Sequence, residues 1–197
     1  MQISNIIFPD SAKDEEKAIS WQQITEISDR DFGFNMPKEK TDKIRFCVRV
    51  LLFNDKDEIC VVKSEKYGYM QLPGGGIEDG ESIIKALCRE TEEETGFLIK
   101  DIEPVGFTLE RREDDRNTHS WGRDISYVFK VLPSKEVGTN YTEDEIDEGF
   151  KPIWVRLEDF IAEQESNEGK IESYSRCFSN RRDLLIAKYF QNRILRN

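Results

Sequence analysis

The sequence predicts an α+β fold in which a mixed β-sheet is covered by two or three helices. Short runs rich in Val, Ile, Leu and Phe, bounded by polar turns, indicate strands in most of the chain. Two further segments have apolar residues at helical spacing, and one of them ends at a glycine. The chain has 197 residues, enough to bury roughly 70% of its extended surface on folding. We therefore expect a single domain.

The first part of the chain differs in texture from the rest. Residues 1–40 are polar, with no sustained period, so we expect an arm that packs on the domain and has a short strand near Ile24 to Ile27. Residues 41–197 are expected to form the domain itself. They open with IRFCVRVLLFN and EICVVKSE, two apolar runs joined by the polar turn NDKD, which is typical of a β-hairpin.

The later elements follow from the same signals. A short strand before the PGGG loop precedes a helix from Glu81 to Thr95, which Gly96 closes. A second helix is expected to start near the RRD segment and to end with basic residues. The other expected elements are strands at 97–99, 105–109, 125–132 and 152–157, a short helix at 158–163 and an acidic loop at 163–169.

Composition narrows the classes of partner. The formal net charge of −11 would repel nucleic acid and anionic membranes, so neither is expected as a partner, and an anionic substrate would need a bound cation. No apolar run approaches the roughly 18 to 20 residues that span a bilayer, and no export signal is visible, so we expect a cytoplasmic protein. The four cysteines lack CxxC spacing and are expected to be buried and reduced. A homodimer is compatible with the sequence.

The most informative stretch is the acidic end of the first helix. At 100° per residue, Glu90, Glu93 and Glu94 share one face, while Glu92 points more nearly to water. The three carboxylates are expected at a rim, beside a core-facing stripe of Ile84, Leu87, Cys88 and Thr91. Carboxylates there repel one another and face the negative end of the helix dipole, and Arg89 can offset only part of this. A solvated acidic face is one interpretation. The other is a site for Mg²⁺ or Mn²⁺, since oxygen ligands without His or Cys suit these cations.

The spacing around this helix resembles a known motif. Gly75, Glu81, Arg89-Glu90, Glu93-Glu94 and Gly96-Phe97 match the 23-residue Nudix box at every charged and glycine position, and only Thr91 departs from the usual aliphatic residue. The wider resemblance to the Nudix hydrolase family covers about residues 41–190. It implies an α/β/α sandwich that hydrolyses the pyrophosphate linkage of a nucleoside diphosphate joined to another moiety, with Mg²⁺ as the cofactor.

The resemblance also implies roles for individual residues. Glu90, Glu93, Glu94 and the carbonyl of Gly74 would bind metal, and Arg89 would hold the glutamates in place. Supporting roles fall to Gly75, Glu81 and Gly96. A glutamate from a later loop acts as base or extra ligand in many members; Glu148 fits that position best, and Glu145 is the alternative.

Substrate contacts are less clear from the sequence. Arg49 and Tyr69 are candidates, the first as a phosphate or ribose contact and the second for stacking a base. Markers of the ADP-ribose, coenzyme A and diadenosine polyphosphate subgroups are missing after the box, so the substrate is not assigned. The alternative function is a Nudix-fold module that binds a nucleotide without cleaving it.

Overall fold

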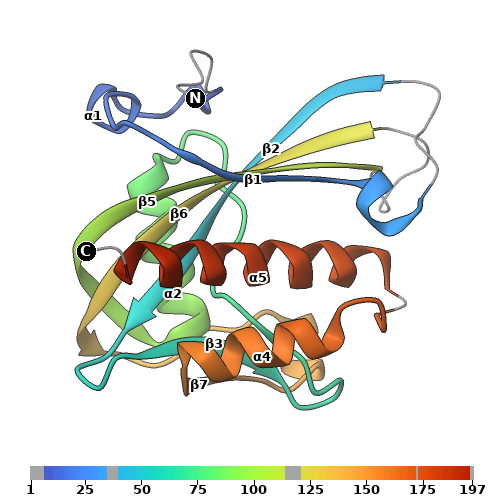
Figure 1. The fold of residues 1–197 in the computed structure, drawn as a ribbon. Coiled ribbons are helices and arrows are strands. Elements are labelled where there is room, and N and C mark those ends of the chain that lie inside the picture. Colours follow the sequence, from blue (N-terminus) through green and yellow to red (C-terminus); the bar gives the residue numbers. More distant parts are fainter. Residues whose placement is uncertain (1–6, 35–39, 114–120, 172, 196–197) are drawn as a thin grey trace.

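The computed structural model describes residues 7–34, 40–113, 121–171 and 173–195 (Figure 1). The sole histidine, His119, lies outside these residues. Along the chain the elements are α1 (Asp14–Lys17), β1 (Gln23–Ser28), η1 (Asp29–Phe32), β2 (Lys40–Phe53), β3 (Glu58–Ser64), β4 (Met70–Gln71), α2 (Ile83–Thr95), β5 (Phe97–Glu113), β6 (Trp121–Glu136), α3 (Glu143–Asp147), β7 (Phe150–Arg156), α4 (Leu157–Asn167) and α5 (Tyr174–Ile194).

The strands form one mixed sheet in the order β1-β5-β6-β2-β3-β4, with β7 paired to β3. The β2–β3 hairpin predicted from the sequence is present, but these two strands pair only next to their turn, at Leu52 with Cys60 and Phe53 with Ile59. Beyond that point β2 and β3 diverge, and the glycine loop takes the place beside β2. The backbone N–H of Val48 donates to the Gly75 carbonyl at 3.0 Å. The divergence therefore places the glycine loop between the two halves of the sheet.

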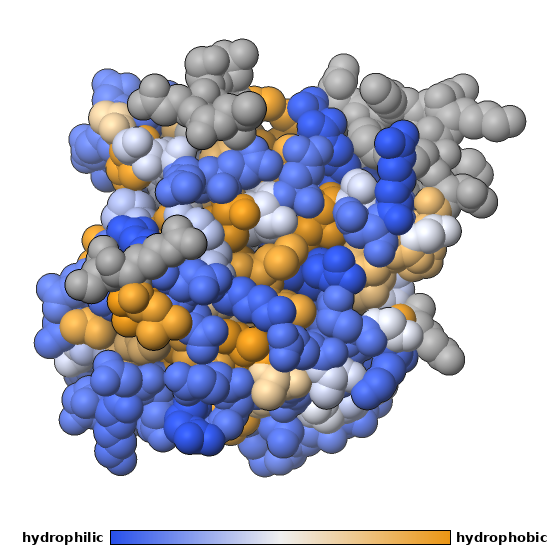
Figure 2. Space-filling model, in the orientation of Figure 1, coloured by the Kyte–Doolittle hydropathy of each residue, from blue (hydrophilic) through white to orange (hydrophobic). Residues whose placement is uncertain are grey.

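Helices cover both faces of the sheet. In Figure 1, α4 and α5 lie across the near face and α2 lies behind it. One apolar core includes Leu51, Val61, Phe160 and Leu184, between the sheet and the α4–α5 pair. A second includes Val50, Leu87 and Phe129, on the α2 side. This is the three-layer arrangement that the sequence predicts. The surface seen in Figure 2 is mostly hydrophilic, with apolar side chains in smaller areas.

Among the elements that differ from their predicted extent are β5, α4 and α5. The strands expected at 97–99 and 105–109 are one continuous strand, β5, whose pairing with β6 shifts register near Lys100 and Pro104. Helix α4 runs on to Asn167 through most of the expected acidic loop, because Gln164 is buried and donates to the Met70 carbonyl at 2.8 Å. Helix α5 starts at Tyr174, well before the RRD segment. The first half of α5 buries polar side chains such as Asn180, so its buried face is not marked by a regular spacing of apolar residues.

The four cysteines differ in their exposure to solvent. Cys47, Cys60 and Cys177 are buried and free as expected, whereas Cys88 is free but exposed. The prediction of burial for Cys88 is therefore wrong, because it lies on the solvent side of α2.

No helix in the described ranges is long and apolar enough to cross a membrane.

The first forty residues contribute to the sheet and to the start of α2. The expected short strand is present as β1, which pairs in parallel with β5. Trp21 packs on Tyr127, with ring centroids 4.9 Å apart, and its indole N–H donates to the Glu16 carbonyl at 3.0 Å. The buried Glu16 carboxylate accepts the backbone N–H of Ile84 at 2.9 Å. An anion at a helix N-terminus is favourable, so this segment stabilises α2 at its beginning.

We expect Glu16→Gln to lower the free energy of unfolding by about 1 kcal/mol, since it replaces a charge-assisted hydrogen bond with a neutral one. Urea unfolding measures the effect. The matched control is Glu15→Gln, which removes an exposed carboxylate from the same short helix and should change stability by less than about 0.5 kcal/mol. Equal stability of the two variants would show that Glu16 does not anchor α2.

Candidate active site on helix α2

Helix α2 begins and ends where its sequence predicts, within two residues. The Ser82 hydroxyl accepts the Lys85 N–H at the N-terminus, and Gly96 closes the helix with φ 76°. The face it buries is not the predicted one. Ile84 is half-buried and Cys88 is exposed, whereas the buried positions are Ile83, Ala86, Leu87, Glu90, Thr91, Glu94 and Thr95. The prediction that the carboxylates lie at a rim beside the apolar stripe is therefore wrong for two of them.

Glu90 and Glu94 are part of the buried face, with 9% and 7% of their surface exposed. Glu93 is half-buried, and Glu92 is exposed as predicted. Burial without a full counter-charge is unfavourable for an anion. Burial raises the pKa of Glu94 to about 8, the Gly74 N–H opposes this, and the charge of Glu90 adds to it. Burial also raises the pKa of Glu90, which the Arg89 guanidinium partly offsets.

The glycine loop contacts both buried carboxylates. The Gly74 N–H donates to Glu94 Oε2 at 2.7 Å. Gly74 has φ 128°, and a Cβ there would collide with the Val48 carbonyl. A Cβ on Gly75 would lie 2.5 Å from Glu90 Oε2. Glycine is thus required at both positions so that the backbone can approach the two carboxylates closely.

Arg89 connects the acids of the motif. Its Nε and Nη2 donate to the two carboxylate oxygens of Glu81 at 3.0 and 2.9 Å. Its Nη1 donates to Glu90 at 2.8 Å and to Glu93 at 3.0 Å, and Nη2 also reaches the Gly76 carbonyl at 2.9 Å. The hydrogen bonds from Arg89 lower the pKa of Glu81. One guanidinium therefore ties the helix start, its last turns and the glycine loop together.

Arg49 lies on the other side of the glycine loop. It is 7% exposed, and its Nη1 donates to the carbonyls of Gly74 and Val48. Its buried Nε has no hydrogen-bond partner within the described part of the protein. Burial, followed by the charge of Arg182, lowers the pKa of Arg49. Gly74 is thus held at its N–H by a carboxylate and at its oxygen by a guanidinium.

A buried ionic group on α5 holds the residue before the loop, and the sequence did not indicate it. Asp183 accepts the backbone N–H of Leu72 at 2.9 Å. Its other oxygen accepts from Arg182 Nε at 2.8 Å, and Arg182 also pairs with Glu110 at 3.4 Å. All three charged residues are nearly inaccessible to solvent. The available signal was the adjacent pair Arg182-Asp183, directly before the apolar run LLIA.

The loop after β6 completes the C-terminal end of α2. The Asn140 N–H donates to the Glu93 carbonyl at 2.8 Å, and the Tyr141 hydroxyl donates to the Glu94 carbonyl at 2.8 Å. The charge of Glu145, in the following helix α3, contributes to raising the pKa of Glu94. This segment therefore brings a further carboxylate into the electrostatic surroundings of the site.

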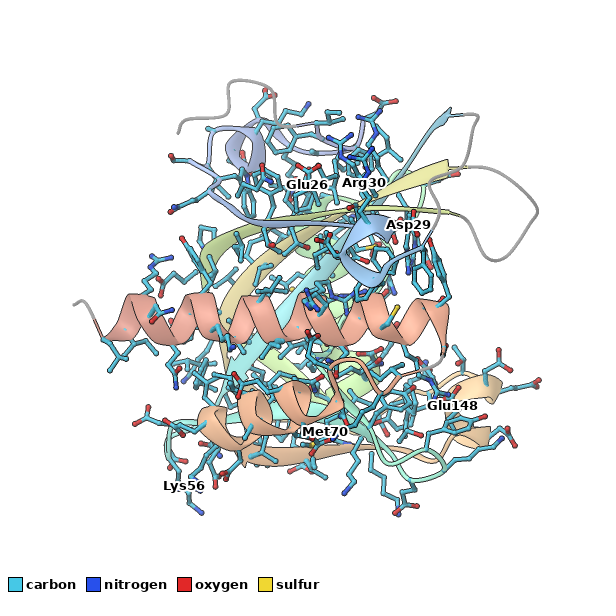
Figure 3. All side chains as sticks on the ribbon, turned by 45° about the vertical axis from the view of Figure 1, so that its right-hand side comes forward. Glu26, Asp29, Arg30, Lys56, Met70 and Glu148 are labelled. Carbon is cyan, nitrogen blue, oxygen red and sulfur yellow. The ribbon has the colours of Figure 1, made fainter. Side chains whose placement is uncertain are left out.

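Glu148 and Tyr69 are in direct contact with each other. The Tyr69 hydroxyl donates to Glu148 Oε2 at 2.8 Å. Burial, and then this hydrogen bond, raise the pKa of Tyr69. Figure 3 shows Glu148 at the end of the molecule where α5 begins. Of the two loop acids, Glu145 contributes to the raised pKa of Glu94, and Glu148 accepts a hydrogen bond from a tyrosine.

The donor set suits a hard divalent cation, although the side chains are not arranged around one. No group of three His, Cys, Asp or Glu side chains in the described ranges is placed to hold a metal ion, and Arg89 engages both Glu90 and Glu93. The donors are nevertheless carboxylate and carbonyl oxygens, two of the carboxylates are buried, and burial raises the pKa of both. Mg²⁺ or Mn²⁺ would supply that charge.

Comparison with known proteins gives consistent matches. Residues 43–177 match the NUDIX domain. The 8-oxo-dGDP phosphatase NUDT18 of Danio rerio is 38% identical over 113 residues, 55% of this chain and 31% of that protein. An RNA pyrophosphohydrolase of a Wolbachia species from Brugia malayi is 42% identical over 59 residues, 29% of this chain and 37% of that protein. The chain spans about a third of the length of these relatives.

Among solved structures, the NUDIX domain of Shewanella oneidensis NrtR, crystallised with ADP ribose, aligns with a TM-score of 0.51 at 16% identity. The alignment covers 82% of this chain and 94% of that one. At this identity the likeness concerns the fold alone. It agrees with the mixed sheet and covering helices described above.

Proposed function

The chain belongs to the NUDIX domain family, and from this premise we propose that it is a Mg²⁺-dependent hydrolase that cleaves the pyrophosphate linkage of a nucleoside diphosphate derivative. The observation that carries the proposal is the pair of buried carboxylates, Glu90 and Glu94, held against the backbone of the glycine loop. The relatives, an 8-oxo-dGDP phosphatase and an RNA pyrophosphohydrolase, support the same class of bond.

The metal would be held by the carboxylates of Glu90, Glu93 and Glu94 and by the carbonyl oxygen of Gly74. Such a cation would supply positive charge against the pyrophosphate and would lower the pKa of a water molecule, so that hydroxide is available as the nucleophile. The Gly74 oxygen accepts a hydrogen bond from Arg49 in this structure.

The protein residues have separate tasks in this scheme. Arg89 holds the acidic side chains close together, because it donates hydrogen bonds to three of them and to a carbonyl of the glycine loop. Asp183 and Arg49 fix the backbone on either side of the loop, so that its carbonyl keeps its direction. A loop carboxylate accepts the proton of the attacking water. We assign this last task to Glu145, because the segment just before it bonds to the last turn of α2, whereas Glu148 accepts a hydrogen bond from Tyr69.

The assignment of the loop acid is tested by two matched variants. Glu145→Gln should lower kcat about 100-fold, since general-base catalysis contributes at least that much. Glu148→Gln should mainly raise KM, because it weakens the bond that orients Tyr69 while leaving the proton acceptor in place. Steady-state kinetics with one good substrate separates the two. The reverse pattern would give the base role to Glu148, the residue favoured by the sequence.

The activity itself is tested with a broad panel of substrates. Nucleoside triphosphates, sugar nucleotides, dinucleotides and capped RNA are incubated with the full chain in Mg²⁺ and, separately, with excess chelator. We expect release of phosphate, pyrophosphate or a nucleotide from at least one substrate, only when Mg²⁺ is present. Nucleotide binding without hydrolysis across the panel would contradict the proposal and would favour a sensing module.

A further inference from the structure

A cavity of about 380 Å³ lies between the β3–β4 connection and the beginning of α5. Its walls include Tyr67, Tyr69 and Gln71 on one side and Lys170, Arg176 and Asn180 on the other. Apart from Tyr69, no residue of this cavity has a role in the chemistry above. The cavity therefore needs its own explanation.

One wall of the cavity is a layer of aromatic rings. The rings of Tyr67 and Tyr69 are close to parallel, at 21°, with centroids 6.4 Å apart. The Arg176 guanidinium lies over both, with Cζ 3.9 Å from the Tyr67 centroid and 4.6 Å from the Tyr69 centroid. Tyr67 is 49% exposed, although large apolar side chains are usually covered. Planar groups layered in this way form a surface on which another planar group can stack.

The second feature of the cavity is unpaired positive charge. Many cations of this acidic protein are paired with carboxylates, as Lys66 is with Asp147 at 2.5 Å. Among the residues that the structure describes, neither Arg176 nor Lys170 has a carboxylate within ion-pair distance. Both cations lie beside this one cavity. They would attract an anionic group to an otherwise repulsive surface.

A planar surface with free cations suits a nucleotide. Stacking supplies affinity for any base, because every base has a π-face. The two tyrosine rings and the guanidinium extend over more area than one six-membered ring covers. We propose that this cavity binds the purine nucleoside monophosphate part of the substrate, with the base on the Tyr67–Tyr69–Arg176 layer. Arg176 and Lys170 then meet the phosphate.

The position of the cavity agrees with this role, and the proposal rests on the hydrolase function proposed above. Gln71 lines the cavity, and Gly74 lies three residues further along the chain, at most about 10 Å away. Glu148 holds Tyr69 by its hydroxyl and so keeps that ring in the layer. A base in the cavity would therefore leave its phosphates near the glycine loop.

The test uses nucleotides that contain no pyrophosphate linkage. Adenosine, guanosine and cytidine monophosphates are titrated into the full chain by calorimetry, without hydrolysis. We expect both purine nucleotides to bind more tightly than cytidine monophosphate. Tyr67→Leu keeps much of the apolar volume but removes the π-face, and should weaken purine binding about tenfold. Tyr67→Phe, which keeps the ring, should bind within about twofold of wild type.

The outcomes separate this inference from the proposed function. Equal purine affinity in wild type and Tyr67→Leu, or no saturable binding of purine nucleotides, would overturn the inference even if the enzyme hydrolyses a substrate. Tyr67-dependent purine binding without any hydrolysis would support the cavity and contradict the hydrolase. Because Tyr67 is half exposed, Tyr67→Leu should fold normally, and its thermal unfolding midpoint is measured as a check.

Discussion

Replacing Glu94 with glutamine is expected to lower turnover of any good substrate at least ~100-fold while leaving the fold intact. The amide oxygen of glutamine can still accept the Gly74 N–H, which donates to Glu94 in the wild type. The carboxylate charge that would hold the cation is lost. Steady-state kinetics in saturating Mg²⁺ measures the effect, and circular dichroism checks the fold.

The same variant should be more stable than wild type at high pH in metal-free buffer. The Glu94 pKa is raised from 4.5 to about 8, so between these values the folded state keeps a proton that the unfolded chain has lost. Wild-type stability therefore falls as pH rises through this window. Glutamine does not titrate, so Glu94→Gln should lack this fall. Urea unfolding at several pH values in chelator measures it.

The control for both effects is Glu92→Gln, which removes an exposed carboxylate from the same helical turn. It should change turnover less than about twofold and stability by less than about 0.5 kcal/mol. Unchanged turnover in Glu94→Gln, or an equal loss in both variants, would contradict the role given to the buried carboxylate.

Arg89→Met is expected to have the largest effect on stability. Arg89 is 25% exposed in its side chain and bonds to Glu81, Glu90 and Glu93, of which the first two are mostly buried. Removing it leaves those carboxylates without their cation, and breaking such a pair costs about 2–4 kcal/mol. Adding Mg²⁺ should restore part of the loss, since a bound cation replaces some of the missing charge. Urea unfolding with and without Mg²⁺ gives both values.

Two further variants sharpen this result. Arg89→Lys keeps the charge but cannot reach the carboxylates and the Gly76 carbonyl together, so it should lie between wild type and Arg89→Met. Lys85→Met removes an exposed cation from the same helix and should be nearly neutral. If Arg89→Met and Lys85→Met were equally stable, the bonds seen at Arg89 would contribute little to the folded state.

The sequence predicted an element correctly where its turn or capping residues and the spacing of its apolar residues indicated the same structure. Helix α2 was predicted from its apolar spacing and from Gly96, and the hairpin from a polar turn between two apolar runs. The close approach of the loop glycines to Glu90 and Glu94 became visible only in the structure.

The features that the sequence did not predict are those formed by buried charged side chains. Because charged residues usually face solvent, Glu90 and Glu94 were expected at a rim, and the first turns of α5 were not recognised as helix. Arg182 and Asp183 are buried because each has a charged or backbone partner from a distant part of the chain. Such partners cannot be identified from local spacing. The same holds for the Arg176 layer, which joins residues more than a hundred positions apart.

The most direct test of the central hypothesis is metal binding to the α2 carboxylates. Mn²⁺ is titrated into the full chain and followed by electron paramagnetic resonance, with Mg²⁺ as competitor. The hypothesis predicts saturable Mn²⁺ binding by wild type, displacement by Mg²⁺, and affinity at least ~10-fold weaker in Glu90→Gln and Glu94→Gln than in Glu92→Gln. Equal Mn²⁺ affinity in all three variants, or no saturable binding by wild type, would contradict it.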